Sequence, residues 1–328
     1  MNLHDFVVSS TNSNETFIIE EVQELWSGYG KILRYELKGS DHKTVIVKHI
    51  KLEQKSEHPR GWEGENSHQR KLKSYQVELN WYKNFSDQTN SNCRIPKCLA
   101  LKYTLSEMVI ILEDLNQVGY PKRCNHIQWT SIQVCIKWLA NFHALFLNTK
   151  PQGLWKTGTY WHLDTRPDEL KALKDIELKN AAFKIDELLT QSKFQTLVHG
   201  DAKLANFCFS QDETKVAVVD FQYVGGGCGM KDLVYFIGSC MNDKESEQKE
   251  SQILEVYFNE LQSALQKNKS RISFNELELD WRSLYHVAWA DFHRFIKGWS
   301  PSHHKINDYS ERVTREVIES IKNNETWY

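Results

Sequence analysis

The pattern of apolar and polar residues near the amino terminus predicts a β-hairpin. The segments KILRYEL (31–37) and TVIVKHI (44–50) are rich in β-branched and apolar residues and lie between turn signals. Gly28 and Gly30 form a turn directly before the first segment. We therefore expect two neighbouring strands joined by a short connection.

A polar segment and then a helix are expected next. Residues 51–71 contain too few apolar residues to build a core, which favours a mobile loop. From Leu72 onward the spacing becomes helical, because Leu72, Tyr75, Leu79 and Tyr82 fall on one face.

Continuous apolar runs predict buried elements further along the chain. MVIILEDL (108–115) stays apolar until it meets two carboxylates, which is typical of a strand that is buried on both faces and ends at the surface. TSIQVCIKWLANFHALFL (130–147) is apolar nearly all round and predicts a buried helix. Two short strands, 196–199 and 216–220, each end in polar residues, and helical patterns follow from about residue 231.

Composition supports a globular protein and narrows its class. Apolar residues make up 40% of the 328 residues and charged residues 26%, which excludes a disordered or fibrous chain. This length suggests two structural units. Lys and Arg number 41 against 43 Asp and Glu, so the chain lacks the basic excess of a nucleic-acid-binding protein.

The sequence also argues against membrane and secreted classes. No run approaches the roughly 18 to 20 apolar residues of a membrane span, and the first residues lack the basic and apolar regions of a signal peptide. The seven cysteines form no CxxC pair and have no histidine at zinc spacing. We expect a cytoplasmic protein with reduced thiols.

Two charged residues are predicted on inward faces. In the 44–50 strand Lys48 shares a face with Ile46 and Ile50, and on the following helix Glu78 lies beside Tyr75 and Leu79. A Lys and a Glu placed in this way could pair beneath a bound polyphosphate. The alternative is that Lys48 reaches the surface along its stem and Glu78 is solvated.

A second group of polar residues follows the short strands. LVHGDAKLANF places His199, Asp201, Lys203 and Asn206 after one strand, and VAVVDFQ places Asp220 at the end of the next. Phosphoryl transfer needs a base near the attacking hydroxyl and oxygen ligands for Mg²⁺. Asp201, Asn206 and Asp220 have the residue types and spacing for these roles.

These motifs resemble a known superfamily. HGDAKLANF and VDFQ are similar to the catalytic and metal-binding motifs of the aminoglycoside phosphotransferase and choline kinase superfamily, and RKLKSYQVELNWY, LEDL and GMKDLVYFIGS resemble its ecdysteroid kinase-like group. The resemblance implies an α+β, two-lobed protein-kinase-like fold. A small amino-terminal sheet lobe with one helix (1–115) would bind ATP, and a larger, mainly helical lobe (116–328) would bind the acceptor.

The resemblance also implies roles for individual residues. Asp201 would orient or deprotonate the acceptor hydroxyl, with Lys203 near the γ-phosphate, and Asn206 and Asp220 would bind Mg²⁺. The implied ATP-binding residues are Gly28, Gly30, Ile46, Lys48, Glu78, Glu113 and Leu115. The resemblance thus implies ATP and Mg²⁺ as cofactors and transfer of the γ-phosphoryl group to a hydroxyl of a small molecule. The carboxy-terminal helices carry many more aromatic residues than carboxylates, which favours a partly apolar acceptor.

Some positions depart from the protein-kinase pattern. Gly200 stands where protein kinases have Arg, and no APE-like segment follows Asp220, which disfavours a protein substrate. The glycines at 225–229 could form a substrate-gating loop or could simply be flexible. His143, on an apolar helix, is interpreted as a core residue, and Asp232 as a structural one.

The acceptor site is the least defined part of the prediction. Trp289, Asp291 and His293 lie in an aromatic carboxy-terminal stretch and are weak candidates to bind the acceptor. Packing is the favoured single interpretation of this stretch. A pseudokinase, or another nucleotide-binding module without turnover, is the competing function. We expect a small-molecule hydroxyl acceptor as partner and no nucleic acid, membrane span or obligate protein partner.

Overall fold

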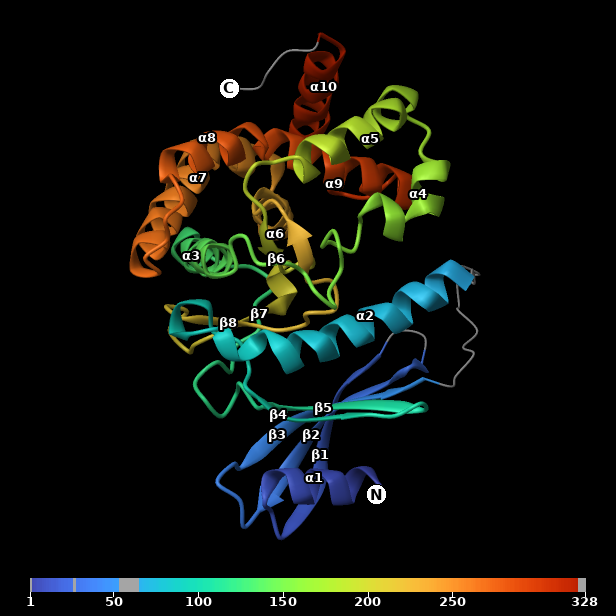
Figure 1. Cartoon of the computed structure of the whole chain (residues 1–328), viewed down its shortest axis with the longest axis vertical. Coiled ribbons are helices and arrows are strands. Elements are labelled where there is room, and N and C mark those ends of the chain that lie inside the picture. The colour runs from blue at the N-terminus through green and yellow to red at the C-terminus, as the bar shows by residue number, and fades with distance from the viewer. Residues whose placement is uncertain (1, 26–27, 53–64, 324–328) are drawn as a thin grey trace. The chain divides into compact units, whose positions relative to one another are not determined.

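The chain divides into two compact units. The computed structural model describes residues 2–25, 28–52 and 65–323, and the side chains of 65 and 66 are not described. The first unit comprises Met1–Asn90, Arg94–Arg123 and Cys208–Gln222, and the second comprises Ser91–Cys93, Cys124–Phe207 and Tyr223–Tyr328 (Figure 1). The first unit thus takes in residues 208–222, which the expected boundary after residue 115 assigns to the second lobe.

The first unit is built on a five-stranded antiparallel sheet in the order β1-β2-β3-β5-β4. Its strands are β1 (Glu15–Glu24), β2 (Gly30–Lys38), β3 (Thr44–Lys51), β4 (Cys98–Tyr103) and β5 (Glu107–Glu113). The predicted hairpin is confirmed as β2 paired with β3. The predicted buried strand is confirmed as β5, in the sheet interior between β3 and β4.

A helix packs on each face of this sheet. Val45 and Val47 of β3 lie on the face of the sheet that α1 (Leu3–Thr11) covers. They belong to one core cluster with Phe6 and Val7 of that helix. Alternate residues point to the other face, where Ile50 joins a cluster with residues of α2 (Glu65–Asn84). Figure 1 shows α1 and α2 with the sheet between them. The alternation of β3 therefore places Lys48 on the α2 side.

The predicted loop at 51–71 is partly wrong. Residues 53–64 lie outside the described residues, but α2 begins at Glu65 rather than at Leu72. The first turns of α2 are polar and carry no apolar stripe, so hydrophobic periodicity could not detect them. The helix from Leu72 onward follows the expectation, with Tyr75 and Leu79 buried.

The last segment of the first unit carries the DFQ motif. A short pair of strands, β7 (Phe207–Phe209) and β8 (Val216–Val218), precedes Asp220. Cys208 and Ala217 of this pair form a small core with Leu115. The motif therefore belongs to the same compact unit as β3 and α2.

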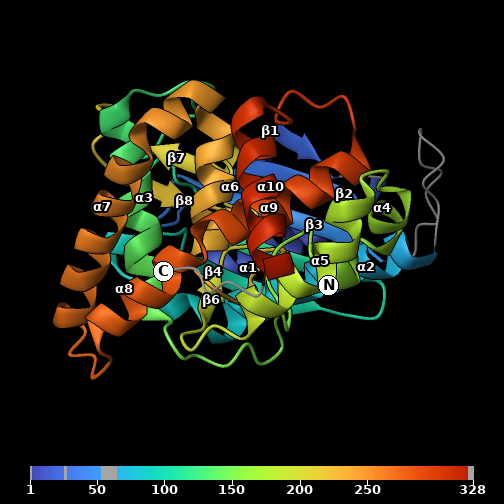
Figure 2. The ribbon, with the colours of Figure 1, turned by 90° about the horizontal axis from the view of Figure 1, so that it is seen from above.

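The second unit is mainly helical. Its helices are α3 (Trp129–Leu145), α4 (Pro167–Ala172), α5 (Ile176–Thr190), α6 (Met230–Cys240), α7 (Asp243–Lys267), α8 (Phe274–Ser283), α9 (Tyr285–Trp299) and α10 (Asp308–Asn323). The predicted buried helix is confirmed as α3, which packs beside α7, while α9 packs against α5, α6 and α10 (Figure 2). None of the described helices is long and apolar enough to cross a membrane.

The glycine-rich segment at 225–229 was expected to be either a substrate-gating loop or a flexible stretch, but its first three residues form a strand. Residues 225–227 form β9 (Gly225–Gly227), which pairs with β6 (Thr196–Val198), and this strand is largely buried. A Cβ at Gly225 would collide with the Trp155 carbonyl, and a Cβ at Gly229 would lie 2.8 Å from the His143 ring. The glycines are needed for close packing, because these neighbours leave no room for a side chain.

Candidate functional site

A buried cation forms the centre of the candidate site in the first unit. Lys48 is 4% exposed, and its Nζ lies 2.5 Å from Glu78 Oε2 and 3.6 Å from Asp220 Oδ1. The three residues come from β3, from α2 and from the segment after β8. The pairing of Lys48 with Glu78, one of the two alternatives left open by the sequence, is the one observed.

The two carboxylates keep the ammonium charged. Burial opposes the charged form, but Glu78 and Asp220 together raise the pKa of Lys48 above its ordinary value. Glu78 is 2% exposed, whereas a third of the Asp220 side chain is exposed. Asp220 is therefore the member of the group that remains accessible to a ligand.

The segment that carries Asp220 is held tightly against α2. Asp220 adopts a left-handed backbone conformation with φ of 71°, which is unusual for a residue other than glycine. Phe221 stacks on Trp81, with ring centroids 4.6 Å apart. Gln222 donates to Asp220 Oδ1 at 2.7 Å and accepts from the Ser74 hydroxyl at 3.2 Å. These contacts fix an otherwise costly conformation.

The glycines proposed for ATP binding lie at the β1–β2 connection. Gly28 donates its backbone N–H to Leu25 O at 3.1 Å. Gly30 has φ of +146°, and a Cβ there would collide with the His49 carbonyl on the paired strand. Strand pairing alone therefore requires Gly30, so its presence is not in itself evidence of a phosphate site.

The three other residues proposed for ATP binding also belong to the first unit. Ile46 is half-buried on the Lys48 side of β3. The Glu113 amide donates to Lys97 O and its carboxylate pairs with Arg94. The Leu115 carbonyl accepts two backbone bonds, whereas its amide has no hydrogen-bond acceptor among the described residues. The Leu115 N–H thus remains a donor for a ligand.

In the second unit, Asp201 is the centre of a compact polar group. Its carboxylate Oδ2 accepts from Lys203 Nζ at 3.0 Å and from Asn206 Nδ2 at 3.2 Å. Asn206 Nδ2 also donates to the Asp201 carbonyl at 2.7 Å. The Asp201 side chain is 10% exposed. The structure thus brings together Asp201, Lys203 and Asn206 of the motif.

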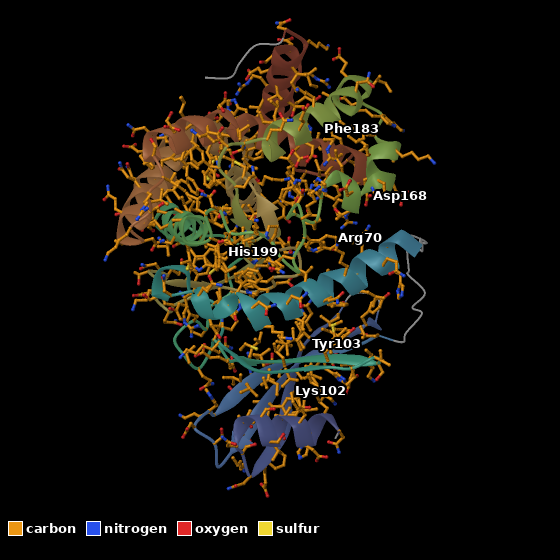
Figure 3. The ribbon with its side chains drawn as sticks, in the orientation of Figure 1. Arg70, Lys102, Tyr103, Asp168, Phe183 and His199 are labelled. Atoms are coloured by element: carbon orange, nitrogen blue, oxygen red, sulfur yellow. The ribbon has the colours of Figure 1, made fainter. Side chains whose placement is uncertain are left out.

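A buried network fixes the backbone of this loop. Asp232 accepts from the amides of His199, at 2.5 Å, and Gly200, at 2.9 Å. His143 contacts Asp232 Oδ2 through Nε2 at 3.1 Å and the Tyr257 hydroxyl through Nδ1 at 2.7 Å. His199, labelled in Figure 3, lies in the densely packed interior of this unit. The structural interpretation of His143 and Asp232 is confirmed.

The same network explains the electrostatics of Asp232. Burial opposes ionisation, but His143 and the loop amides hold the pKa of Asp232 below its ordinary value. Asp232 therefore remains a carboxylate and binds the loop backbone. Its structural role is to position the 199–201 segment.

Gly200 cannot be replaced by the arginine of protein kinases. It has φ of +79°, and a Cβ there would collide with the Tyr223 carbonyl and approach Thr159 N to 2.8 Å. Only glycine fits this close contact. The departure from the kinase pattern thus follows from local packing.

Two of the candidate residues have oxygen atoms that suit Mg²⁺. Both hydrogen bonds of Asn206 use Nδ2, which leaves its Oδ1 as a hard oxygen ligand. The Asp220 carboxylate is partly exposed, as a ligand must be. Within the described residues no group of three or more His, Cys, Asp or Glu could hold a metal. Asn206 of the second unit and Asp220 of the first unit therefore each have an oxygen of the type that binds Mg²⁺.

The weak acceptor candidates on α9 all have internal contacts in the second unit. Asp291 pairs with Arg294 at 2.9 Å and lies 3.5 Å from Lys231. His293 contacts Thr314 on α10, and Trp289 packs edge-on against the Tyr309 ring. Burial opposes ionisation of Asp291, but the cations lower its pKa to about 2. An acceptor role for these residues stays a prediction.

Three residues beyond the expected ones, Tyr160, Tyr235 and Lys305, interact electrostatically with Asp201. Tyr160 and Tyr235 have ring centroids 5.5 Å apart, and Asp201 contributes to the raised pKa of both, after burial. Lys305 also interacts electrostatically with Asp201. Tyr235 follows Asp232 by one helical turn, so helical spacing could have suggested it. Lys305 has no such signal.

Comparison with family models decides the family. The model of the ecdysteroid kinase-like family matches residues 30–155 and 160–270, which include every catalytic and metal-ligand candidate. The chain belongs to this family. Family members are kinase-like small-molecule phosphotransferases, so the resemblance noted from the motifs is confirmed. A search of curated proteins gives no significant match.

Solved structures confirm the fold. An ethanolamine kinase from Plasmodium vivax is 10% identical, with a TM-score of 0.51, over 93% of this chain and 83% of that one. A Ralstonia eutropha protein provisionally named an aminoglycoside phosphotransferase is 12% identical, with a TM-score of 0.50, over 97% and 94%. The protein-kinase-like α+β fold is therefore confirmed.

A third structure is more distant. An aminoglycoside phosphotransferase from Streptomyces rimosus, solved with ADP and streptomycin, is 13% identical over 87% of this chain and 99% of that one. Its TM-score is 0.46.

Proposed function

We propose that the protein transfers the γ-phosphoryl group of ATP to a hydroxyl of a small, partly apolar molecule, with Mg²⁺ as cofactor. Membership of a small-molecule kinase family supports this reaction class. The observation that carries the proposal is the buried Lys48 ammonium, held between Glu78 and Asp220. An ammonium kept charged at a buried position is suited to binding phosphate oxygens.

In this proposal the first unit binds the nucleotide. Lys48 holds the α- and β-phosphates, and Glu78 fixes the position of Lys48. Gly28 and Gly30 allow close approach of the backbone to the triphosphate, while Ile46 packs on the purine. Backbone groups of Glu113 and Leu115 bind the adenine edge, and the Leu115 amide is a donor that no described group uses.

The catalytic loop of the second unit acts on the acceptor. Asp201 accepts the proton of the acceptor hydroxyl or orients that hydroxyl for attack. Lys203, 3.0 Å from Asp201, neutralises charge on the transferred group. Asn206 Oδ1 and the Asp220 carboxylate are the proposed ligands for Mg²⁺, which when bound neutralises charge on the phosphates.

An ADP-release screen tests the reaction class. The wild-type protein and the Asp201→Asn variant are given ATP, Mg²⁺ and panels of sterols, sugars, nucleosides and other alcohols. We expect acceptor-dependent ADP release that falls by roughly 10²-fold or more in Asp201→Asn, because the variant cannot accept a proton. Nucleotide affinity should stay nearly unchanged.

Two results would count against the proposal. Wild-type turnover in Asp201→Asn would remove this residue from the mechanism. ATP binding without acceptor-dependent ADP release over the whole panel would instead favour a nucleotide-binding module without turnover.

A further inference from the structure

Aromatic rings of the second unit gather beside Asp201. Tyr235 of α6 and Phe292 of α9 have ring centroids 5.1 Å apart, and both belong to a buried cluster with Trp161. The Tyr160 N–H donates to the carbonyl of Gly200, directly before Asp201, at 3.1 Å, and the Tyr160 ring lies 5.5 Å from that of Tyr235. Burial raises the pKa of Tyr235, and the charge of Asp201 raises it further. The candidate catalytic carboxylate therefore borders an aromatic surface, the kind of surface that binds cations through cation–π attraction.

A cation of the protein itself already lies on this surface. Lys305, in the segment between α9 and α10, places its Nζ 5.1 Å from the ring centroid of Tyr235 and 5.5 Å from that of Phe292. Its side chain is half-buried, and no carboxylate among the described residues pairs with the ammonium at ion-pair distance. The ammonium thus lies over the two rings and also interacts electrostatically with Asp201.

We propose that Lys305 determines acceptor specificity: its ammonium fills the aromatic surface beside Asp201 and excludes acceptors that carry a positive charge close to the reactive hydroxyl. The inference rests on the proposed function, in which Asp201 receives that hydroxyl. A cationic acceptor would have to displace Lys305 from the rings and would be repelled by it. A neutral or anionic acceptor meets neither obstacle.

The charged neighbours of Lys305 strengthen this bias. Burial lowers its pKa to about 8, with Lys203 lowering it further, while Asp201 and Cys240 raise it. At neutral pH Lys305 therefore remains mostly protonated. Two ammonium groups, those of Lys203 and Lys305, then interact with the single Asp201 carboxylate, which leaves little negative charge to attract a cationic acceptor.

Tetramethylammonium chloride is the probe that tests the inference without any knowledge of the acceptor. Its affinity for wild type, Lys305→Ala, Lys305→Arg and Lys193→Ala is measured by tryptophan fluorescence and calorimetry. Lys305→Ala removes the ammonium from the two rings, so we expect this variant to bind tetramethylammonium at least about tenfold more tightly than wild type. Lys305→Arg keeps the cation, and Lys193→Ala removes an exposed lysine elsewhere in the unit, so both should bind like wild type.

The inference fails if Lys305→Ala binds tetramethylammonium no better than wild type, or if Lys193→Ala gains as much affinity. Lys305→Ser provides a second neutral, small replacement if the alanine variant does not fold, and the same result is required of it. Far-UV circular dichroism and the melting temperature report folding of each variant.

A kinetic comparison separates this inference from the proposed function. Choline and 3,3-dimethylbutan-1-ol have the same shape, but only choline is charged. In the ADP-release assay, wild type should favour the neutral alcohol by about tenfold or more in kcat/KM, and Lys305→Ala should narrow that ratio. If no protein releases ADP with these two alcohols or with any member of the acceptor panel, the proposed reaction is contradicted, while the tetramethylammonium result still decides whether Lys305 blocks the aromatic surface.

Discussion

In the first unit, the Lys48 ammonium is held by two side-chain carboxylates, whereas in the second unit the loop before Asp201 is held by one carboxylate that binds backbone amides. Both arrangements are buried and both support candidate catalytic groups. The two arrangements differ in whether mutation can remove both partners of the interaction. An ion pair can be deleted as a pair, but the His199 and Gly200 amides remain after any substitution of Asp232.

This difference indicates where stability and function coincide. The Lys48–Glu78 pair could be exchanged for apolar residues with little loss of stability, so its presence is better explained by ligand binding than by folding. Asp232, in contrast, is needed by the fold itself, because unsatisfied buried amides are costly. Substitutions in each of the two arrangements measure how much each one contributes to the free energy of unfolding.

The largest effect is expected for Asp232→Ala. The variant leaves two buried amides and the His143 ring without their acceptor, so the free energy of unfolding should fall by about 3–5 kcal/mol. Urea denaturation measures the change. Asp168→Ala, at an exposed carboxylate in the first turn of α4, is the control and should cost less than about 1 kcal/mol. Equal losses for the two variants would show that the network does not stabilise the loop.

An intermediate effect is expected for the pair in the first unit. Lys48→Met leaves the buried Glu78 carboxylate without its closest cation and should cost about 3 kcal/mol. The double variant Lys48→Met/Glu78→Leu should recover more than half of that loss while ATP binding stays impaired. If the double variant loses as much stability as the two single variants together, the pair cannot be replaced by apolar residues.

The matched control for this cycle is the exposed pair of Lys31 and Glu21 in the same sheet. Their side chains are 51% and 44% exposed, so solvent screens the pair and Lys31→Met/Glu21→Leu should show little or no coupling in the free energy of unfolding. A coupling as large as that of Lys48 and Glu78 would mean that burial is not the cause.

The smallest effect concerns a carboxylate near the surface of the second unit. Asp175 caps α5 and pairs with Lys297 at 2.8 Å and with Arg315. Burial opposes ionisation, but hydrogen bonds from Arg315 and Lys297 lower the pKa of Asp175 from 3.8 to about 2. Because the folded pKa lies below the unfolded one, the stabilisation is complete above about pH 5 and is lost as the pH falls from 4 to 2.

Melting temperatures of wild type and Asp175→Asn between pH 7 and pH 2 test this dependence. Near neutral pH the melting temperature of wild type should be the higher one, by an amount that corresponds to a difference of about 1 kcal/mol or less in the free energy of unfolding. The difference is small because Arg315 is partly exposed and solvent weakens the pair. The gap should close toward pH 2. A gap that widens on acidification would contradict the assigned sign.

Local periodicity explains which features the sequence could predict. Strand alternation placed Lys48 inward and helical spacing placed Glu78 inward, so their contact could be expected from two short segments. The HGDAKLANF motif is contained in one loop, so its internal contacts could be expected as well. The hairpin, β5 and α3 follow from the same kind of pattern.

Other features depend on residues far apart in the chain. Asp201, Tyr235 and Lys305 come from three segments whose only connection is tertiary packing, and no repeat in the sequence relates them. The close packing of Gly225 against the Trp155 carbonyl is likewise a property of two distant segments. The sequence shows the glycine, but only the fold shows what occupies the space beside it.

The most direct test of the account is the effect of Mg²⁺ and ATP on the melting temperature of wild type, Asp201→Asn and Asp220→Ala. The account predicts that Mg²⁺ and ATP together stabilise wild type and Asp201→Asn equally, and well beyond ATP alone, because ligand binding stabilises the folded state. Asp220→Ala should lose the increment due to Mg²⁺. If ATP without Mg²⁺ stabilises wild type just as well, or if Asp220→Ala retains the increment, the assignment of Asp220 as a metal ligand is wrong.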